Sequence, residues 1–322
     1  MENRQTKSPI FIVGHSRSGS TLLASLLGRH PNIHAIPETH FFNGSYSGFF
    51  LRRLWAQKSI NKILSYTVER NVRLRDIGVT QKEIKEFSNN EHLASVKSVF
   101  NSIMGIELQR SGKQRILEKT PYHIEHIDRV FRWYPGAKVI CTIRDSRDTI
   151  DSLVKAPWTH SNPQRHAAYW SWCVREALNK QRKYPAGMLI CKYEDLVTEP
   201  VQELKRITDF IDEKFVPTLI SGSPISQVIP SWEKSWKEKA EQEIDGSYAY
   251  KWKKATKKRH EDWSIWTRGG LKDMHYPNPY SGKKRVSFIY YQPTFNFLYR
   301  FWVVFRTHFA ERKNKYRRKS LK

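Results

Sequence analysis

Residues 9–23, PIFIVGHSRSGSTLL, constrain the fold of this 322-residue chain more strongly than any other stretch. An apolar run at positions 10–13 enters a loop bounded by Gly14 and Gly19, and leucines at helical spacing follow from Thr21. A strand that turns through such a loop into a helix directs several backbone N–H groups and the positive end of a helix dipole at one anion. The pattern therefore predicts a buried strand, a phosphate-binding loop and a helix in immediate succession.

The spacing of the two loop glycines matches the nucleotide-binding pattern G-x-x-x-x-G-K-[ST] in all but one position. Ser20 stands where that pattern has its lysine, and the nearest cation, Arg17, lies inside the loop. A nucleoside triphosphatase without the lysine would lack its main contact to the transferred phosphoryl group. We therefore interpret the stretch as a phosphate loop that does not serve ordinary phosphoryl transfer. A tight turn between a core strand and a core helix is the alternative.

The charge of the chain favours an anionic ligand or surface. Lys and Arg number 56 against 31 Asp and Glu, which gives a formal net charge of +25. Residues 283–322 hold twelve of the basic residues and the single acid Glu311, so the remainder is only moderately basic. Nucleotides and acidic lipid headgroups are typical partners of such chains. Nucleic acid is not expected as a partner, because the sequence contains neither a zinc-finger cysteine pattern nor a basic helix in a helix-turn-helix frame.

Cysteine usage and hydropathy predict a cytoplasmic location. The three cysteines are Cys141, Cys173 and Cys191, a widely spaced set, and two of them lie in apolar runs. This pattern favours free thiols in a reducing compartment. The first apolar run is too short for a signal peptide, and no uninterrupted apolar stretch reaches membrane-spanning length.

Two further apolar runs, at 137–143 and 188–192, have a helical segment beside them and are interpreted as buried strands. Apolar strands that alternate with helices indicate a parallel sheet covered on both faces. We therefore predict an α/β fold, a P-loop-like three-layer α/β/α arrangement with a mainly parallel sheet. Ligands of such sheets lie beyond the carboxyl ends of the strands, where this chain places the phosphate loop, Arg144 and Tyr193.

The segments between these runs are assigned to a loop and to helices. Residues 30–42 are rich in turn formers and predict a loop that carries Glu38 near its end. Helical spacing dominates from about 41 to 110, and Ser88 with Glu91 forms a capping-box pattern ahead of a long periodic stretch.

A second basic site is expected after the strand at 137–143. Arg144 ends that strand, and Ser152 follows eight residues later, two turns into the next helix. An arginine at a strand end and a nearby hydroxyl suit a second phosphate, separate from the first. The alternative is a helix that Asp145 or Ser146 caps, with exposed arginines beside it. Two phosphate sites at one edge imply a nucleotide that carries two phosphate groups.

The two motifs together resemble those of the sulfotransferases that use 3′-phosphoadenosine 5′-phosphosulfate (PAPS), and the resemblance extends over about residues 9–200. It implies that the 5′-phosphosulfate loop consists of Arg17, Ser18, Gly19, Ser20 and Thr21. It also implies that Arg144 and Ser152 bind the 3′-phosphate and that Tyr193 contacts the adenine. PAPS is then the co-substrate, and no metal is expected.

The resemblance is closer to the tyrosylprotein and bacterial branch, whose loop has arginine where the cytosolic phenol and steroid enzymes have lysine. It implies that Glu38 is the catalytic base and that Lys119 and Arg17 stabilise the transferred group. The tyrosylprotein enzymes carry an arginine two residues after the glutamate, where this chain has His40. This departure argues against tyrosine peptides as acceptors. It also makes His40 a rival base, since residues 38 and 40 of an extended loop project to the same side.

We predict a sulfotransferase domain over residues 1–282, with a helical acceptor-side insertion at about 41–110, and a basic aromatic C-terminal helix or tail over 283–322. Aromatic residues of the insertion either line a hydrophobic or sugar-stacking cleft or belong to the core; they are Phe41, Phe42, Tyr46, Phe49 and Phe50. One helical face of the tail carries Phe295, Leu298, Trp302, Phe305 and Phe309. That face either binds an anionic membrane surface or packs on the body.

The sequence thus predicts an enzyme that moves a sulfuryl group from PAPS to a hydroxyl of a lipid, sterol or glycan by in-line displacement. The membrane alternative for the tail favours such acceptors and a peripheral position on the inner face of a membrane. Two other functions stay open at this point: a P-loop-type kinase or nucleoside triphosphatase, and a non-catalytic basic protein associated with membranes.

Overall fold

The computed structural model describes residues 7–44, 64, 74, 77–88, 95–221, 244–254 and 258–280. Within these ranges five strands form one sheet in which every neighbouring pair is parallel, in the spatial order β2-β3-β1-β4-β5. The strands are β1 Ile10–Gly14, β2 Ile33–Ile36, β3 Arg115–Lys119, β4 Lys138–Ile143 and β5 Met188–Lys192. The predicted α/β fold is confirmed, and the described sheet is wholly rather than mainly parallel.

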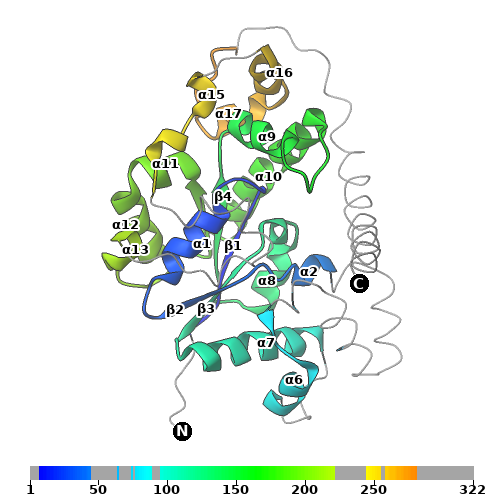
Figure 1. The fold of residues 1–322 in the computed structure, drawn as a ribbon, viewed down its shortest axis with the longest axis vertical. Helices are drawn as coiled ribbons and strands as arrows, with labels where there is room; N and C mark the ends of the chain where they lie inside the picture. The colour runs from blue at the N-terminus through cyan, green and yellow to red at the C-terminus, as the bar shows by residue number, and fades with distance from the viewer. Residues whose placement is uncertain are drawn as a thin grey trace, which may run out of the picture.

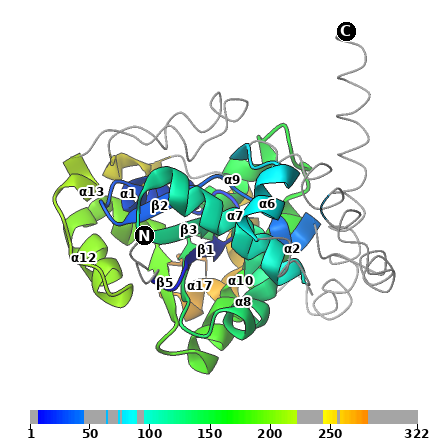
Figure 2. The ribbon, with the colours of Figure 1, turned by 90° about the horizontal axis from the view of Figure 1, so that it is seen from below.

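Helices cover both faces of this sheet (Figure 1). One face packs against α1 Ser20–Gly28, α11 Tyr193–Thr198, α12 Pro200–Phe210 and α13 Thr218–Ser221. The other face packs against α7 Val96–Ser111, the 3₁₀ helix η2 Pro121–His126, α8 Ile127–Trp133 and α10 Pro163–Lys183. Viewed from below, α12 and α13 lie to one side of the strands and α7 to the other (Figure 2). The predicted three-layer arrangement is therefore present.

The remaining helices are short and lie outside these two layers or at their margins. They are α2 Phe41–Gly44, α6 Gln81–Phe87, α9 Ser146–Val154, η6 Gly246–Tyr248, α15 Lys251–Lys254, α16 Lys258–Trp266 and α17 Arg268–Asp273. None of the helices in the described ranges is long and apolar enough to cross a membrane. The predicted tail over 283–322 and the aromatic residues Tyr46, Phe49 and Phe50 lie outside the described residues.

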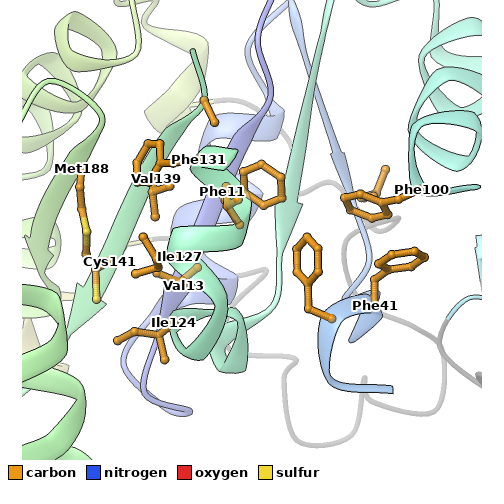
Figure 3. Packing of buried hydrophobic residues seen from close by; sticks show 14 of the residues in the cluster. Phe11, Val13, Phe41, Phe100, Ile124, Ile127, Phe131, Val139, Cys141 and Met188 are labelled. Atoms are coloured by element: carbon orange, nitrogen blue, oxygen red, sulfur yellow. The ribbon is translucent and has the colours of Figure 1, made fainter. Parts of the chain in front are cut away.

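The alternation of side chains along β1 explains why a hydrophobic core packs on each face of the described sheet. Phe11 and Val13 belong to the cluster under α7, α8 and α10, whereas Ile10 and Ile12 belong to the cluster under α1 and α12. Successive residues of a strand point to opposite faces, so a strand covered on both sides is apolar throughout. Figure 3 shows Phe11 and Val13 beside Val139 of β4, with helical side chains packed on them. The cysteines are buried and free, as predicted.

The strand order places a topological switch between β1 and β4. The chain leaves β1 toward β2 and β3 on one side and later adds β4 and β5 on the other. In sheets of this kind the loops after the two strands that flank the switch diverge, and a ligand binds between them. Here those loops are residues 14–19, after β1, and the turn that begins at Arg144, after β4.

The prediction of a loop over 30–42 was wrong in part, and β3 was missed altogether. Strand β2 has only four residues and lies between Pro31 and Pro37, so it shows no usable periodicity. Strand β3, RILEK, is charged at three of its five positions, yet all five are buried. Arg115 pairs with Glu213 at 3.3 Å, and such partners make charged strand positions tolerable in a core. Partners so distant in sequence leave no local pattern.

The structure decides between the two alternatives for Phe41 and Phe42 and corrects one expectation for the helical insertion. Phe41 and Phe42 are fully buried against Phe100, with ring centroids 4.4 and 5.5 Å away, so both belong to the core and do not line a cleft. Ser88 ends α6 rather than starting the following helix. Helix α7 instead begins after Ser95, whose hydroxyl accepts a hydrogen bond from the N–H of Ser98 at 3.0 Å.

Candidate active site

The loop over residues 14–19 joins β1 directly to α1 and is built around its two glycines. Gly14 and Gly19 have φ angles of 139° and 91°, a region that favours glycine. A Cβ atom on Gly14 would lie 2.3 Å from the carbonyl oxygen of Thr142. The Ser18 hydroxyl donates to the His15 carbonyl at 2.6 Å and contacts the Thr142 hydroxyl at 2.7 Å. That hydroxyl braces the loop, so a ligand role for Ser18 would rest on its backbone N–H.

The aromatic ring of Tyr193, which follows β5, packs against residues that follow two other strands. Gly19 is the N-cap of α1, and as a glycine it has no side chain with which to cap that helix. A Cβ atom on Gly19 would lie 2.4 Å from Cδ2 of Tyr193, the first residue of α11. The guanidinium of Arg144 lies over the same ring, 4.3 Å from its centroid. The phosphate loop, the end of β4 and the end of β5 therefore meet at Tyr193.

Replacing Gly19 with alanine is expected to disrupt this contact. The added methyl meets both an unfavourable φ and the Tyr193 ring, so we expect a loss of about 3 kcal/mol in the free energy of unfolding. Gly112 is the matched control, because its φ is 66° but nothing lies within 4 Å of its Cβ position. Gly112→Ala is expected to cost only the backbone term, about 1–2 kcal/mol. Equal losses in urea denaturation of the two variants would contradict the packing of Tyr193 on the loop.

A second group of side chains surrounds the ammonium of Lys119 at the end of β3. Its Nζ donates to Glu38 Oε1 at 2.5 Å and to Thr21 Oγ1 at 3.3 Å. Glu38 Oε2 in turn contacts His40 Nε2 at 2.9 Å. Lys119 is fully buried, and Glu38 is 8% exposed. A lysine at the end of β3 thus links the phosphate loop to a carboxylate and an imidazole that follow β2.

Arg17 connects the two predicted phosphate sites. Its Nε donates to the Ser152 hydroxyl on α9 at 2.9 Å. The residues of the two predicted phosphate sites, expected to be separate, therefore touch through Arg17 and Ser152. Arg17 itself adopts a left-handed backbone conformation, with φ of 71°, inside the loop.

The guanidinium of Arg144 is only partly satisfied by the described residues. Its NH2 group donates to the Tyr248 carbonyl at 2.8 Å and lies 3.5 Å from Asp148 Oδ2. Its Nε is buried and has no hydrogen-bond partner in the part of the chain that the structure describes. A buried donor without a partner is costly, and a bound anion would satisfy it.

The electrostatics of the loop fit an anionic ligand. Burial lowers the pKa of Arg17, and the positive charge of Arg144 lowers it further. Two arginines that repel each other in a poorly solvated place are stabilised by an anion between them. The uncapped N-terminus of α1 points to the same kind of ligand. The residues present therefore fit a nucleotide with two anionic ends.

Every strand of the described sheet contributes to this edge. Arg17 to Thr21 follow β1, Glu38 and His40 follow β2, Lys119 ends β3, Arg144 follows β4, and Tyr193 follows β5. The residues predicted from the sequence are thus brought together, with Ser20 buried as the first residue of α1. Glu118, Thr120 and Glu194 were not predicted, because their roles depend on contacts between segments that are distant in the sequence.

A buried polar cluster fixes the turn that carries Arg144. Asp145 caps α9, as one alternative predicted, and its carboxylate accepts from the Arg147 Nε at 2.8 Å. Arg147 is fully buried rather than exposed. The N–H of Asp145 donates to Glu194 at 3.0 Å, and the Tyr276 hydroxyl donates to the same carboxyl group at 2.8 Å. Burial raises the pKa of Glu194 to about 7.

This raised pKa predicts how the stability of the protein depends on pH. The folded protein holds the Glu194 proton up to about pH 7, whereas the unfolded chain releases it near its ordinary value of 4.5. The stability associated with protonated Glu194 is therefore fully present below pH 4.5 and is lost as the pH rises through 7. We expect Glu194→Gln to gain roughly 3 kcal/mol relative to the wild type between pH 4.5 and 7.5. Denaturant titrations across this range test it, and parallel stability curves would contradict it.

Comparison with known proteins identifies the family. The model of the sulfotransferase family matches residues 9–217, which include all five strands and every predicted site residue. The chain belongs to the sulfotransferase family. Its resemblance to that family, drawn from the loop and the strand end at Arg144, is confirmed. The kinase or nucleoside triphosphatase alternative is accordingly not retained.

Individual relatives of this sulfotransferase are distant. A putative protein-tyrosine sulfotransferase of Caenorhabditis briggsae is 25% identical over 64% of the chain and 66% of its own length. Protein-tyrosine sulfotransferase A of Caenorhabditis elegans is 27% identical over 65% of the chain and 50% of its own length. The aligned part therefore spans between half and two thirds of these curated relatives.

Solved structures share the fold of this sulfotransferase. The sulfotransferase domain of the Synechococcus PCC 7002 olefin synthase superposes with a TM-score of 0.61 at 22% identity, covering 87% of this chain and 98% of that one. The sulfotransferase domain of the curacin biosynthetic pathway gives the same TM-score and identity over 85% of this chain and 100% of that domain. At this identity the likeness establishes the fold.

Proposed function

We propose that this sulfotransferase transfers a sulfuryl group from PAPS to a hydroxyl of its acceptor. The observation that carries the proposal is the position of Lys119, whose ammonium contacts both Thr21 of the phosphate loop and Glu38. A cation shared by an anion-binding loop and a carboxylate is the arrangement that transfer of an anionic group to a hydroxyl requires.

The binding roles follow from the charges at the strand ends. PAPS supplies the sulfuryl group and departs as adenosine 3′,5′-bisphosphate. Arg17, the N–H groups at the start of α1 and Thr21 would hold the 5′ end, while Arg144 and Ser152 would hold the 3′-phosphate. The ring of Tyr193, already in contact with Arg144, would lie beside the adenine.

The acid–base role falls to Glu38 and His40 acting as a pair. One carboxylate oxygen of Glu38 contacts the Lys119 ammonium, and the other orients the His40 imidazole. The pair would accept the proton of the attacking hydroxyl, and Lys119 would stabilise negative charge on the transferred group. Fixed cations thus provide the charge neutralisation in this proposal, and no step in it uses a metal.

The acceptor is proposed to be a hydroxyl of a lipid, sterol or glycan. With Phe41 and Phe42 assigned to the core, a different ring lies beside the proposed base. The partly buried ring of Tyr122 lies 6.1 Å from that of His40. Such a ring suits apolar or sugar-ring contacts. Because two relatives carry the name of protein-tyrosine sulfotransferases, tyrosine peptides belong among the acceptors to be tested.

The proposal is tested first by binding and then by transfer. Adenosine 3′,5′-bisphosphate is expected to raise the melting temperature without magnesium, and to do so more than ATP with magnesium. Incubation with labelled PAPS and a panel of sterols, glycolipids, sugars and tyrosine peptides, analysed by mass spectrometry, then identifies the acceptor. If the bisphosphate fails to stabilise the full chain, or no member of the panel is sulfated, the proposed function is contradicted.

A further inference from the structure

A buried carboxylate on β3, Glu118, lies behind the pair formed by Glu38 and His40. Glu118 is fully buried, and its register partner on β2 is Ile36, two residues before Glu38. Its Oε1 accepts hydrogen bonds from the Thr39 hydroxyl at 2.8 Å, the Thr120 hydroxyl at 2.6 Å and the Thr39 N–H at 3.3 Å. Its Oε2 lies 2.9 Å from His123 Nδ1.

The same cluster receives four consecutive backbone N–H groups of the loop after β2. The N–H of Thr39 donates to Glu118 itself, and that of His40 donates to the Thr120 hydroxyl at 3.2 Å. The N–H of Phe41 donates to the Thr39 hydroxyl at 3.1 Å, and that of Phe42 donates to His123 Nε2 at 3.3 Å. Each of the three relaying side chains is itself bonded to Glu118.

The hydrogen bonds also define the protonation of this cluster. His123 Nε2 accepts from the Phe42 N–H, so the ring proton lies on Nδ1 and is donated to Glu118. Burial by itself would raise the pKa of Glu118, but the contacts with His123 and the two threonine hydroxyls outweigh burial, and the pKa is lowered. The carboxylate is ionised and accepts from every neighbour that fixes the loop.

The loop needs this support because its backbone is strained. His40 has a φ of 47°, in the left-handed region, which costs a residue with a side chain about 1–3 kcal/mol. In that conformation the His40 ring returns to Glu38 at 2.9 Å while Glu38 keeps its 2.5 Å contact with Lys119. The bonds to Glu118 fix the loop backbone in the conformation in which both contacts form.

We propose that Glu118 is the positioning residue for Glu38 and His40, holding the loop in the conformation that joins them to Lys119. This inference rests on the function proposed above, in which those two residues form the acid–base pair. Glu118 itself touches neither the phosphate loop nor Lys119 through any hydrogen bond of the described residues. Its role is to fix four N–H groups, and its loss is expected to act through the geometry of the loop.

Two substitutions test the proposal in the full chain. Glu118→Gln replaces the carboxylate with an amide, whose NH₂ group cannot accept the hydrogen bonds that Glu118 receives. Thr120→Val keeps the shape of the side chain but removes the hydroxyl that accepts from the His40 N–H and donates to Glu118. Both are expected to lower kcat for PAPS turnover roughly 10- to 100-fold and to leave the Kd for adenosine 3′,5′-bisphosphate unchanged. The ring-nitrogen NMR shifts of His40, assigned by comparison with His40→Asn, are expected to change from one tautomer to a mixture.

Glu107→Gln is the matched control, because Glu107 also contacts a histidine, His34 at 3.2 Å, away from this loop. It is expected to change neither kcat nor the His40 signals. If His40 keeps one tautomer in both test variants, the inference is wrong, whether or not PAPS is turned over. If the wild type shows no turnover but the variants alter His40, the inference stands and the proposed function fails. If Glu118→Gln does not fold, the kcat and the His40 signals of Thr120→Val alone test the inference.

Discussion

Replacing Arg144 with alanine is expected to weaken the binding of adenosine 3′,5′-bisphosphate by about 100-fold, or roughly 3 kcal/mol. Arg144 combines a buried Nε that has no partner in the described chain with a guanidinium stacked on Tyr193. The substitution therefore removes both the charge proposed to meet the 3′-phosphate and the guanidinium that covers the Tyr193 ring. Isothermal titration calorimetry with the bisphosphate measures the loss directly.

The control for this experiment is a partly exposed arginine outside the candidate site, with a buried carboxylate as its partner. Arg206 contacts Glu203 one helical turn away on α12, and we expect Arg206→Ala to leave the affinity unchanged. Salt dependence gives a second criterion, since the wild type should lose affinity with ionic strength more steeply than Arg144→Ala. Wild-type affinity in Arg144→Ala would remove the end of β4 from the nucleotide site.

Glu38→Gln is expected to reduce sulfuryl transfer by about 1000-fold while preserving nucleotide binding. The amide is not a base at neutral pH. Its NH₂ group donates and cannot accept a hydrogen bond, so the amide oxygen can replace only one of the two contacts, with Lys119 or with His40. The variant thus removes the proposed proton acceptor and separates the two groups that Glu38 joins. Single-turnover rates with bound PAPS measure the chemical step apart from nucleotide affinity.

His40→Asn distinguishes the members of the pair. If Glu38 alone takes the proton, His40→Asn should retain most of the rate, whereas joint action requires both variants to be slow. Glu107→Gln again serves as the control for loss of a carboxylate that contacts histidine. A normal rate in Glu38→Gln would exclude Glu38 from the acid–base role.

The central part of the fold was predictable because its signals are local. Strands β1, β4 and β5 are short apolar runs, and β5 has the predicted bounds Met188–Lys192. Glycine spacing revealed the loop, and the position of Arg144 after an apolar run revealed the second basic site. Each of these features depends on side chains within a few residues of one another, so a single sequence displays them.

The part of the candidate site next to β2 and β3 could not be predicted from local sequence patterns. Glu118 and Lys119 make β3 look like a charged surface segment, although both are fully buried. Their partners, Thr39 and Glu38, lie about eighty residues earlier in the chain. The roles of Glu38 and Lys119 came from family resemblance, and the support that Glu118 gives them required the structure. Pairing of buried charges is a property of tertiary contact and leaves no periodicity.

The strand order also fixes the distance between the two sides of the candidate site. The proposed proton acceptor follows the edge strand β2, and the Tyr193 ring follows the opposite edge strand β5. Four interstrand spacings of about 4.8 Å separate these edges by roughly 19 Å, a width that backbone hydrogen bonds fix. Side-chain substitutions can retune either end, but the span between them can change only if a strand is added, lost or displaced. The backbone of the sheet therefore fixes the width that a bound PAPS molecule would have to span. Segments outside the sheet shape the acceptor side of the proposed site.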